Sequence, residues 1–159
     1  MVAVRPGMVP MTRPKAEPQM MQTMLFQLHM MVRPSKKLSI ITHHCGALVP
    51  YFAARIAVHY DNGLERLGAE HFPGLTKHPV EYFRMFYADT ALNGNTPALM
   101  CAYDFFGEDH ILFGTDMPYD TGNGDVSIRQ TIQAIEGMDI SEGAKKKIFE
   151  GNARKLLKL

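Results

Sequence analysis

Two adjacent histidines and a cysteine stand in the segment IITHHCGALVPYF, residues 40 to 52, directly after a short apolar run. Imidazole and thiol groups can carry protons, bind metals or act as nucleophiles. On an extended strand the side chains of His43 and His44 point to opposite faces, so they do not easily ligate one metal together. At most one of the two histidines is therefore expected to face a site.

Cys45 is the third candidate in this segment, as a nucleophile beside a histidine. A histidine that is adjacent in sequence rarely has the geometry to deprotonate a thiol, and no third group that would orient the histidine is indicated. We therefore interpret Cys45 as a small apolar residue that packs under the loop.

Two aspartates also follow apolar runs. Asp116 comes after ILFG (111–114) and precedes Met117-Pro118. A carboxylate at such a position is costly unless it is hydrogen-bonded, ion-paired or bound to a metal, so Asp116 is a candidate for chemistry, with a helix-cap or loop aspartate as the alternative. Asp89 is followed by several turn formers and is expected to accept backbone hydrogen bonds there.

The remaining histidines lie in predicted helices, in loops or at the start of a strand. We expect each of them to be a surface or packing residue. They are His29, His59, His71, His78 and His110.

Three strand-then-helix units position these residues. The β-branched run LSIIT (38–42) predicts a strand buried on both faces, as in a parallel sheet. A helix follows from Pro50, with an interruption near Asn62-Gly63. The aromatic run 82–88 predicts a second strand, which precedes the next helix.

The second and third units have the same pattern. The sequence TPALMCAYDFFG predicts a helix that Gly107 ends. The run ILFG predicts a third strand, VSIRQTIQAI predicts the helix after it, and Ser141 is a good N-cap for a last amphipathic helix with Ile148 and Phe149 on its apolar face. Polar residues follow each strand, so we predict a parallel α/β sheet with its functional face at the carboxyl edge; a barrel and an open sheet both satisfy this rule.

Length and composition predict one soluble globular domain. The chain has 159 residues, of which 46% are hydrophobic, and its net charge of +1 gives no electrostatic case for nucleic acid. Two cysteines are too few for a disulfide framework, which favours the cytoplasm. We expect an irregular arm over residues 1–19, a helix with Met20, Met24 and Leu28 on one face, and neither a signal peptide nor a membrane span.

Three motifs resemble those of the metal-dependent amidohydrolase superfamily, in the branch that contains aminocarboxymuconate-semialdehyde decarboxylase and the resorcylate decarboxylases. HCGALVPYFAAR, read from His44, matches the pattern H-x-G-x-x-x-P-[FY]-x-x-x-R. ILFGTDMPYD is similar to the last-strand signature of this branch, and KIFEGNARKLL is similar to its closing helix. The resemblance covers roughly residues 20–159.

This resemblance implies a (β/α)8 barrel, with the site on the carboxyl face of the strands. It implies that Asp116 is a metal ligand and a proton-transfer group, and that His44 is an acid-base residue beside the metal, while His43 faces away. It implies that Arg55 contacts a substrate carboxylate, and this contact could cross a dimer interface. The alternative is that Arg55 is an arginine on the helix surface. Zinc is the expected metal, with manganese as the alternative.

The chain departs from the family pattern at its start. The family carries an H-x-H or E-x-H metal pair on its first strand and a further histidine on its fifth strand, and this chain has no such pair near its start. We expect a truncated barrel that corresponds to the C-terminal half of the family fold. Its open strand edges and uncovered apolar face would favour a homo-oligomer.

Three functions are consistent with these motifs. The first is a metal-dependent, non-oxidative decarboxylase of a small aromatic or unsaturated carboxylic acid, a carbon–carbon lyase. The second keeps the same site and hydrolyses a lactone, ester or amide. The third is a non-catalytic barrel fragment that acts as an assembly module.

Overall fold

The structure is a computed structural model that describes residues 39–159. The irregular arm predicted over residues 1–19, and with it the start of the barrel domain at residue 20, lies outside the described residues. The methionine-rich helix that the sequence predicts from residue 20 lies outside them as well. Within residues 39–159, no helix is both long and apolar enough to cross a membrane.

Three short parallel segments follow one another across a small sheet. Strand β1 (Ile41–Thr42) pairs in parallel with strand β2 (Tyr87–Ala88). On the other side of β2, Ala88 forms a parallel bridge to Ile111. The structure therefore confirms that the three predicted segments are parallel and lie side by side in chain order. Each segment is shorter than predicted.

The edges of this sheet differ from the prediction. The side chain of Ile41 is 49% exposed, so the expectation that the first strand is buried on both faces is wrong at this residue. Within the run ILFG, only Ile111 pairs as a strand residue. Phe113 N–H instead donates to the carbonyl of Ile148 at 3.0 Å. The C-terminal helical region thus takes the hydrogen-bonding position that a further strand would occupy.

The aromatic run 82–88 is wrong as a strand along most of its length. Helix α3 (Pro79–Arg84) covers its start, with Pro79 in the first turn and His78 Nδ1 accepting a hydrogen bond from Val80 N–H at 3.2 Å. Tyr82 and Phe86 are four residues apart and are both less than a tenth exposed, which is a helical spacing. Burial of this face, together with a proline and a cap at its start, outweighs the β propensity of the aromatic residues.

Helix α2 (Val49–Leu67) is the longest element. Its start agrees with the prediction, since Pro50 occupies the first turn, where a missing N–H costs nothing. The predicted interruption near Asn62-Gly63 is wrong, because the helix runs through both residues. The ring of Phe72 lies 2.9 Å from the position that a Cβ on Gly63 would occupy, so the glycine lets the following loop pack closely on the helix.

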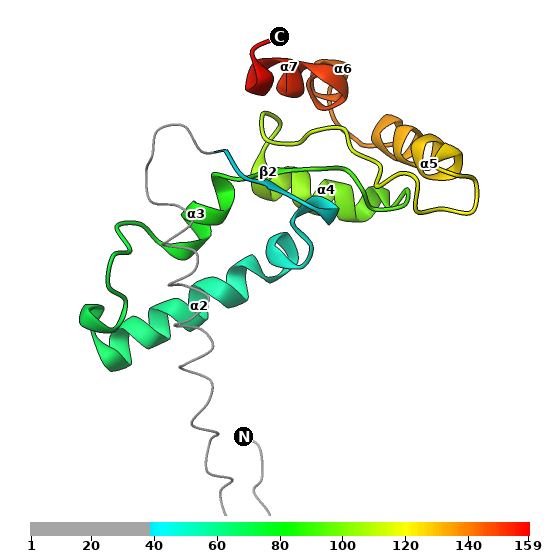
Figure 1. Ribbon diagram of the computed structural model, residues 1–159. Coiled ribbons are helices and arrows are strands. Elements are labelled where there is room, and N and C mark those ends of the chain that lie inside the picture. Colours follow the sequence, from blue (N-terminus) through cyan, green and yellow to red (C-terminus); the bar gives the residue numbers. More distant parts are fainter. Residues whose placement is uncertain (1–38) are drawn as a thin grey trace, which may run out of the picture.

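Two further helices confirm the predicted units. Helix α4 (Thr96–Phe106) begins where the Asn95 side chain accepts a hydrogen bond from Ala98 N–H, and Gly107 ends it at a φ of 79°. Helix α5 (Asp125–Glu136) follows the third strand segment. Figure 1 shows α4 close to the strands and α5 beside it.

The C-terminal region contains helix α6 (Glu142–Lys146), a π-helical segment (Lys147–Gly151) and helix α7 (Asn152–Leu157). The side chain of Ser141 caps α6, as predicted, by accepting a hydrogen bond from Ala144 N–H. The buried Asn152 amide donates to the carbonyl of Glu108 at 2.7 Å and to the carbonyl of Ile111, in the third strand segment, at 2.8 Å. The last helix is therefore attached to the sheet by polar contacts as well as by its apolar face.

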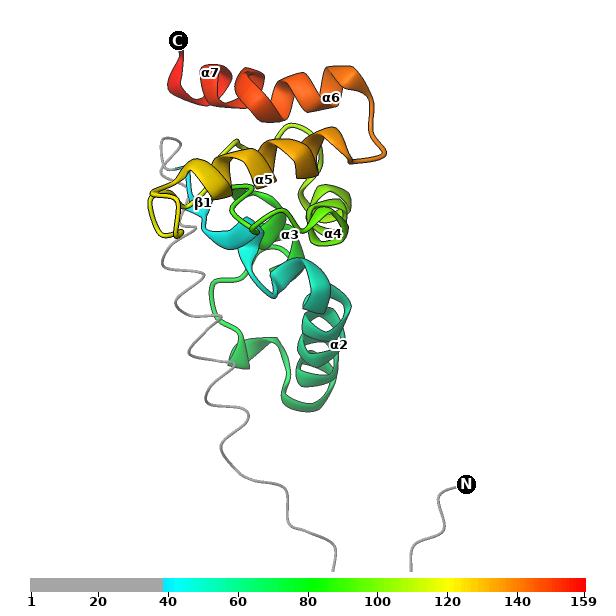
Figure 2. The ribbon, with the colours of Figure 1, turned by 90° about the vertical axis from the view of Figure 1, so that its right-hand side faces the viewer.

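The core lies where α4, α5 and the C-terminal region meet the sheet. Four of its largest side chains are at most 1% exposed, and each comes from a different part of the chain: Leu99, Ile111, Ile135 and Ile148. Figure 2 shows α6 and α7 above α5, with α2 extending away at the opposite end. Strand ends and helix starts between these layers carry the candidate site residues.

Candidate functional site

His44 lies in a tight turn directly after β1. The turn comprises His44–Gly46, and its residues have positive φ values of 50°, 53° and 77°; Ala47 continues the run at 51°. Non-glycine residues rarely adopt this left-handed backbone conformation, and it persists only where surrounding contacts hold it. A run of such residues, placed at the carboxyl edge of a sheet, marks this turn as a candidate functional element.

Gly46 permits the turn to pack against α4. A Cβ at this position would lie 2.7 Å from the ring of Phe106, and the φ of Gly46 is +77°. A side chain would therefore meet both a backbone penalty and a steric clash. The glycine of the H-x-G pattern thus has a packing reason in this fold.

Replacing Gly46 with alanine should destabilise the protein by about 1–2 kcal/mol through the backbone, and by about 1–3 kcal/mol more through the clash with Phe106. Gly107→Ala is the matched control, because Gly107 has a φ of +79° and open space around its missing Cβ. Chemical denaturation of both variants measures the difference. Equal losses for the two variants would contradict the packing role of Gly46.

The imidazole of His44 is held by one backbone contact. Its Nδ1 lies 3.2 Å from the carbonyl oxygen of Ala91, a residue that follows β2. A carbonyl oxygen only accepts, so this hydrogen bond requires a proton on Nδ1. The other nitrogen, Nε2, is then unprotonated in the neutral ring. This tautomer leaves Nε2 able to accept a proton.

Asp89 joins the ends of β1 and β2. Its Oδ1 accepts hydrogen bonds from Cys45 N–H at 2.9 Å and from Ala91 N–H at 3.1 Å, which confirms the expectation of backbone bonds. Its Oδ2 lies 3.7 Å from Nδ1 of His43, whose side chain is 87% exposed. His43 therefore lies next to Asp89 at the sheet edge and makes no contact with His44 beyond ring proximity.

Cys45 is buried, with 2% of its surface exposed. Burial, followed by the negative charge of Asp89 and the neighbouring Cys101, raises the pKa of the Cys45 thiol from 9.0 to about 12. A thiol with such a pKa is protonated near neutral pH and is a poor nucleophile. The interpretation of Cys45 as a packing residue is thereby supported.

Asp116 lies after the third strand segment, at the same edge of the sheet, with a φ of 60°. The expectation of a costly carboxylate that needs partners does not hold, because the residue is exposed. Within residues 39–159 its carboxylate accepts no hydrogen bond from protein groups. The structure places His44 and Asp116 at one edge, without a direct hydrogen bond between them.

The loop after Asp116 is organised by Asp120, a residue that the sequence analysis did not single out. Its Oδ1 accepts hydrogen bonds from the N–H groups of Gly122 and Gly124, and its Oδ2 accepts from the N–H and the hydroxyl of Ser127. These bonds, with the Ser127 hydroxyl first, lower the pKa of Asp120 from 3.8 to about 2. The signal in the sequence was an aspartate followed by a glycine-rich turn and a serine at a helix start.

Asp120→Ala should lower the stability at neutral pH, and the difference from the wild type should shrink as the pH falls from about 4 towards 2. The folded-state pKa lies below the unfolded value of 3.8, so the stabilisation is complete above that value and is lost as the carboxylate protonates. Urea denaturation at several pH values measures it. Asp139→Ala, at an exposed aspartate, is the control, and a difference that does not depend on pH would contradict the role of Asp120.

Arg55 lies on the exposed surface of α2. No salt bridge joins its guanidinium to a carboxylate of the described residues. Its role in binding a substrate carboxylate stays a prediction.

Two of the histidines set aside from the sequence have structural contacts. His78 caps α3 and lies 3.5 Å from a carboxylate oxygen of Asp61. His110 bonds to the carbonyl of Phe86 at 3.0 Å and stacks on Tyr87. Both are packing residues, as expected.

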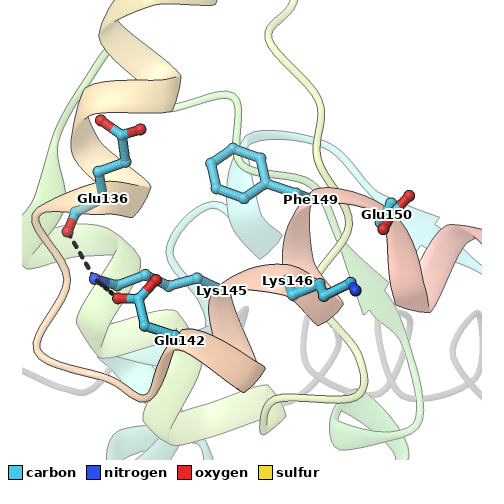
Figure 3. A pocket seen from close by; sticks show the side chains of 6 residues that line it. All are labelled: Glu136, Glu142, Lys145, Lys146, Phe149 and Glu150. Carbon is cyan, nitrogen blue, oxygen red and sulfur yellow. Dashed lines mark hydrogen bonds and ion pairs between the residues drawn. The ribbon is translucent and has the colours of Figure 1, made fainter.

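A cavity of about 560 Å³ lies between the end of α5 and α6 (Figure 3). Lys145 Nζ reaches across it to the carbonyl of Glu136 and to the carboxylate of Glu142, both at 2.9 Å. Three glutamates and two lysines among its six lining residues give no preference for ligands of one charge. The lining includes neither His44 nor Asp116, so this cavity is separate from the sheet-edge residues.

The family pattern implies a divalent metal. Within residues 39–159, no group of three or more His, Cys, Asp or Glu side chains is placed to hold a metal ion. A stable site normally needs three protein ligands. Asp116 alone does not meet this requirement, and the described residues therefore do not form a complete metal site.

The fold is of the α/β class, in which parallel strands alternate with helices. Its candidate histidine and aspartate side chains lie at the carboxyl ends of the strands. A family model described as "Amidohydrolase" matches residues 11–159. The chain belongs to this amidohydrolase family.

Similar proteins include 6-methylsalicylic acid decarboxylase of Penicillium expansum, 32% identical over 117 residues, and gamma-resorcylate decarboxylase of Polaromonas sp. (strain JS666), 36% identical over 123 residues. The matches cover 74% and 77% of this chain, and 34% and 35% of the relatives. The chain thus spans about a third of the length of the curated relatives it matches.

Solved structures agree with this relationship. Dihydroxybenzoic acid decarboxylase from Polaromonas sp. JS666, with bound manganese and 2-nitroresorcinol, is similar with a TM-score of 0.68 at 31% identity, over 89% of this chain and 41% of that one. A 2,6-dihydroxybenzoate decarboxylase in complex with 2,6-dihydroxybenzoate gives a TM-score of 0.67 at 28% identity, over 89% and 42%.

Proposed function

We propose that this chain carries the proton-transfer part of a non-oxidative decarboxylase site for small hydroxylated aromatic carboxylic acids, within a partial (β/α)8 barrel that starts near residue 20. The observation that carries the proposal is the position of His44 and Asp116 at one carboxyl edge, in a family whose similar members are named as decarboxylases of such acids. The expected unsaturated, non-aromatic substrates find no counterpart among those names.

The proposed reaction needs one proton and releases carbon dioxide. Asp116 protonates the ring carbon that bears the carboxylate. The bond between that carbon and the carboxylate carbon then breaks, and its electron pair restores the aromatic ring. His44 Nε2, unprotonated when Nδ1 bonds to Ala91, accepts and returns a proton at the substrate hydroxyl. Arg55 binds the substrate carboxylate in this proposal, for which a guanidinium is suited.

Manganese replaces zinc as the metal we propose, because similar structures carry manganese. Asp116 would supply one carboxylate ligand, of the oxygen type that manganese accepts. Because residues 39–159 lack a complete ligand set, no step of the reaction is assigned to the metal.

We also propose that the chain forms a homo-oligomer in the cytoplasm. Leu48, just before helix α2, and Tyr51 and Val58 on it are large apolar side chains with 67%, 76% and 57% of their surface exposed. Burial of such apolar surface favours association. Both cysteines are free thiols, as a reducing compartment favours.

The test is turnover of 2,6-dihydroxybenzoate by the purified chain with excess manganese. Chromatography measures the product 1,3-dihydroxybenzene, and a separate assay measures the carbon dioxide released. We expect both products in equal amounts. No product from this acid or from a panel of hydroxybenzoates would contradict the proposal.

A second candidate function is a non-catalytic assembly module. The absence of a three-residue metal cluster within residues 39–159 favours it. Lack of turnover together with a stable oligomer would support this candidate over the decarboxylase.

A further inference from the structure

We infer that Asp89 is a positioning residue that fixes both the backbone and the ring tautomer of His44. This inference rests on the proposed function for its catalytic meaning and on the contacts of Asp89 for its structural content. Asp89 follows β2, 45 residues after His44, and has a side chain that is 15% exposed.

One oxygen of Asp89 holds both groups that define the position of His44. Oδ1 accepts from Cys45 N–H, which belongs to the peptide unit that follows His44, at 2.9 Å. The same oxygen accepts from Ala91 N–H at 3.1 Å, and the carbonyl of Ala91 is the partner of the His44 ring at 3.2 Å. Loss of this oxygen would release the backbone of the turn and the acceptor of the ring together.

The backbone around His44 needs such an external restraint. His44, Cys45 and Ala47 all have positive φ values, a left-handed backbone conformation that is unfavourable for residues other than glycine. Within the turn itself, Gly46 N–H donates to the His43 carbonyl at 3.1 Å and Ala47 N–H donates to the His44 carbonyl at 2.8 Å. The hydrogen bond from Cys45 N–H to Asp89 links the backbone of this turn to the end of β2.

Asp89 is itself fixed by all three strand segments. Its N–H donates to the carbonyl of Thr42, at the end of β1, at 3.2 Å. A Cβ on Gly114, in the third segment, would lie 3.0 Å from the Cβ of Asp89, so the two backbones are in close approach. This support gives the carboxylate a defined place from which to hold the turn.

Nitrogen-15 NMR of the full chain tests the inference. The ring nitrogens of His44, assigned with His44→Asn, should show a protonated Nδ1 and an unprotonated Nε2 in the neutral form.

Asp89→Ala should shift the ring towards the other tautomer and speed amide exchange at Cys45 and Ala91 about tenfold, equivalent to one lost hydrogen bond. Asp89→Asn retains an acceptor oxygen and should restore both signals. The serine side chain is too short to reach both N–H groups, so Asp89→Ser should change the signals as Asp89→Ala does. It replaces the alanine variant in the test if that variant does not fold.

Thr90→Val is the matched control for general loosening of this edge. The Thr90 hydroxyl forms hydrogen bonds with the backbone of Gly114 at 2.8 and 3.0 Å and forms none with the His44 turn. The control should leave the His44 nitrogens unchanged. An equal change in the control, or wild-type signals in both the alanine and serine variants, would overturn the inference.

Kinetics adds a readout that depends on the proposed function. Asp89→Ala should lower kcat about 10–100-fold with little change in KM, and Asp89→Asn should stay within about threefold of the wild type. The NMR signals could change as expected while neither the wild type nor the variants release carbon dioxide. In that case the proposed function fails and the positioning role of Asp89 stands.

Discussion

His44→Asn is expected to lower kcat for 2,6-dihydroxybenzoate about 10²–10⁴-fold, the range over which a positioned acid-base group contributes. Asparagine tolerates the positive φ of 50° at this position, and its amide can still donate to the carbonyl of Ala91. The turn should therefore keep its shape while the proton-accepting nitrogen is lost. Steady-state kinetics with excess manganese measures the effect.

His43→Asn is the matched control, because His43 is the preceding residue and its side chain is 87% exposed. We expect its kcat to stay within about threefold of the wild type. Circular dichroism and the denaturation midpoint should be unchanged in both variants. A large loss in the His43 variant with none in the His44 variant would reverse the choice between the two histidines.

Asp116→Asn should reduce kcat by a similar factor, about 10²–10⁴-fold, because the amide can neither donate an acidic proton nor act as an anionic metal ligand. The substitution suits the backbone, since asparagine accepts the φ of 60° at this residue. Its exposure means that folding should be unaffected.

Manganese provides a readout of Asp116 that does not need turnover. Paramagnetic broadening of amide signals near residue 116 should appear when Mn²⁺ is added to the wild type and should disappear in Asp116→Asn. Asp139→Asn, at another exposed aspartate, should leave the broadening in place. Persistent broadening in the Asp116 variant would show that the ion binds elsewhere and would remove Asp116 from the ligand set.

Several parts of the fold could be predicted because short-range interactions decide them. Ser141 caps its helix by accepting a hydrogen bond from the N–H group three residues on, and Gly107 ends α4 at a φ of 79°. Each of these contacts is complete within one turn of the chain, so the local sequence contains all its partners.

Burial changed the assignment of the second strand. The aromatic run 82–88 has high β propensity, and yet most of it is α3 and the turn after it, because Tyr82 and Phe86 reach the core only at helical spacing. Helix α2 likewise continues through Gly63, where the ring of Phe72 packs against the helix. Propensity is a weak prior that packing can override.

The sequence by itself determined the family, the order of the strand-and-helix units and the candidates His44 and Asp116, because motif spacing and hydrophobic periodicity are properties of neighbouring residues. Tertiary structure decided which partners hold these candidates. The link from Asp89 to Cys45 spans 44 residues, and the contact of His44 with Ala91 spans 47. Such contacts exist only once parallel strands have brought distant segments to one edge, so no local pattern could specify them.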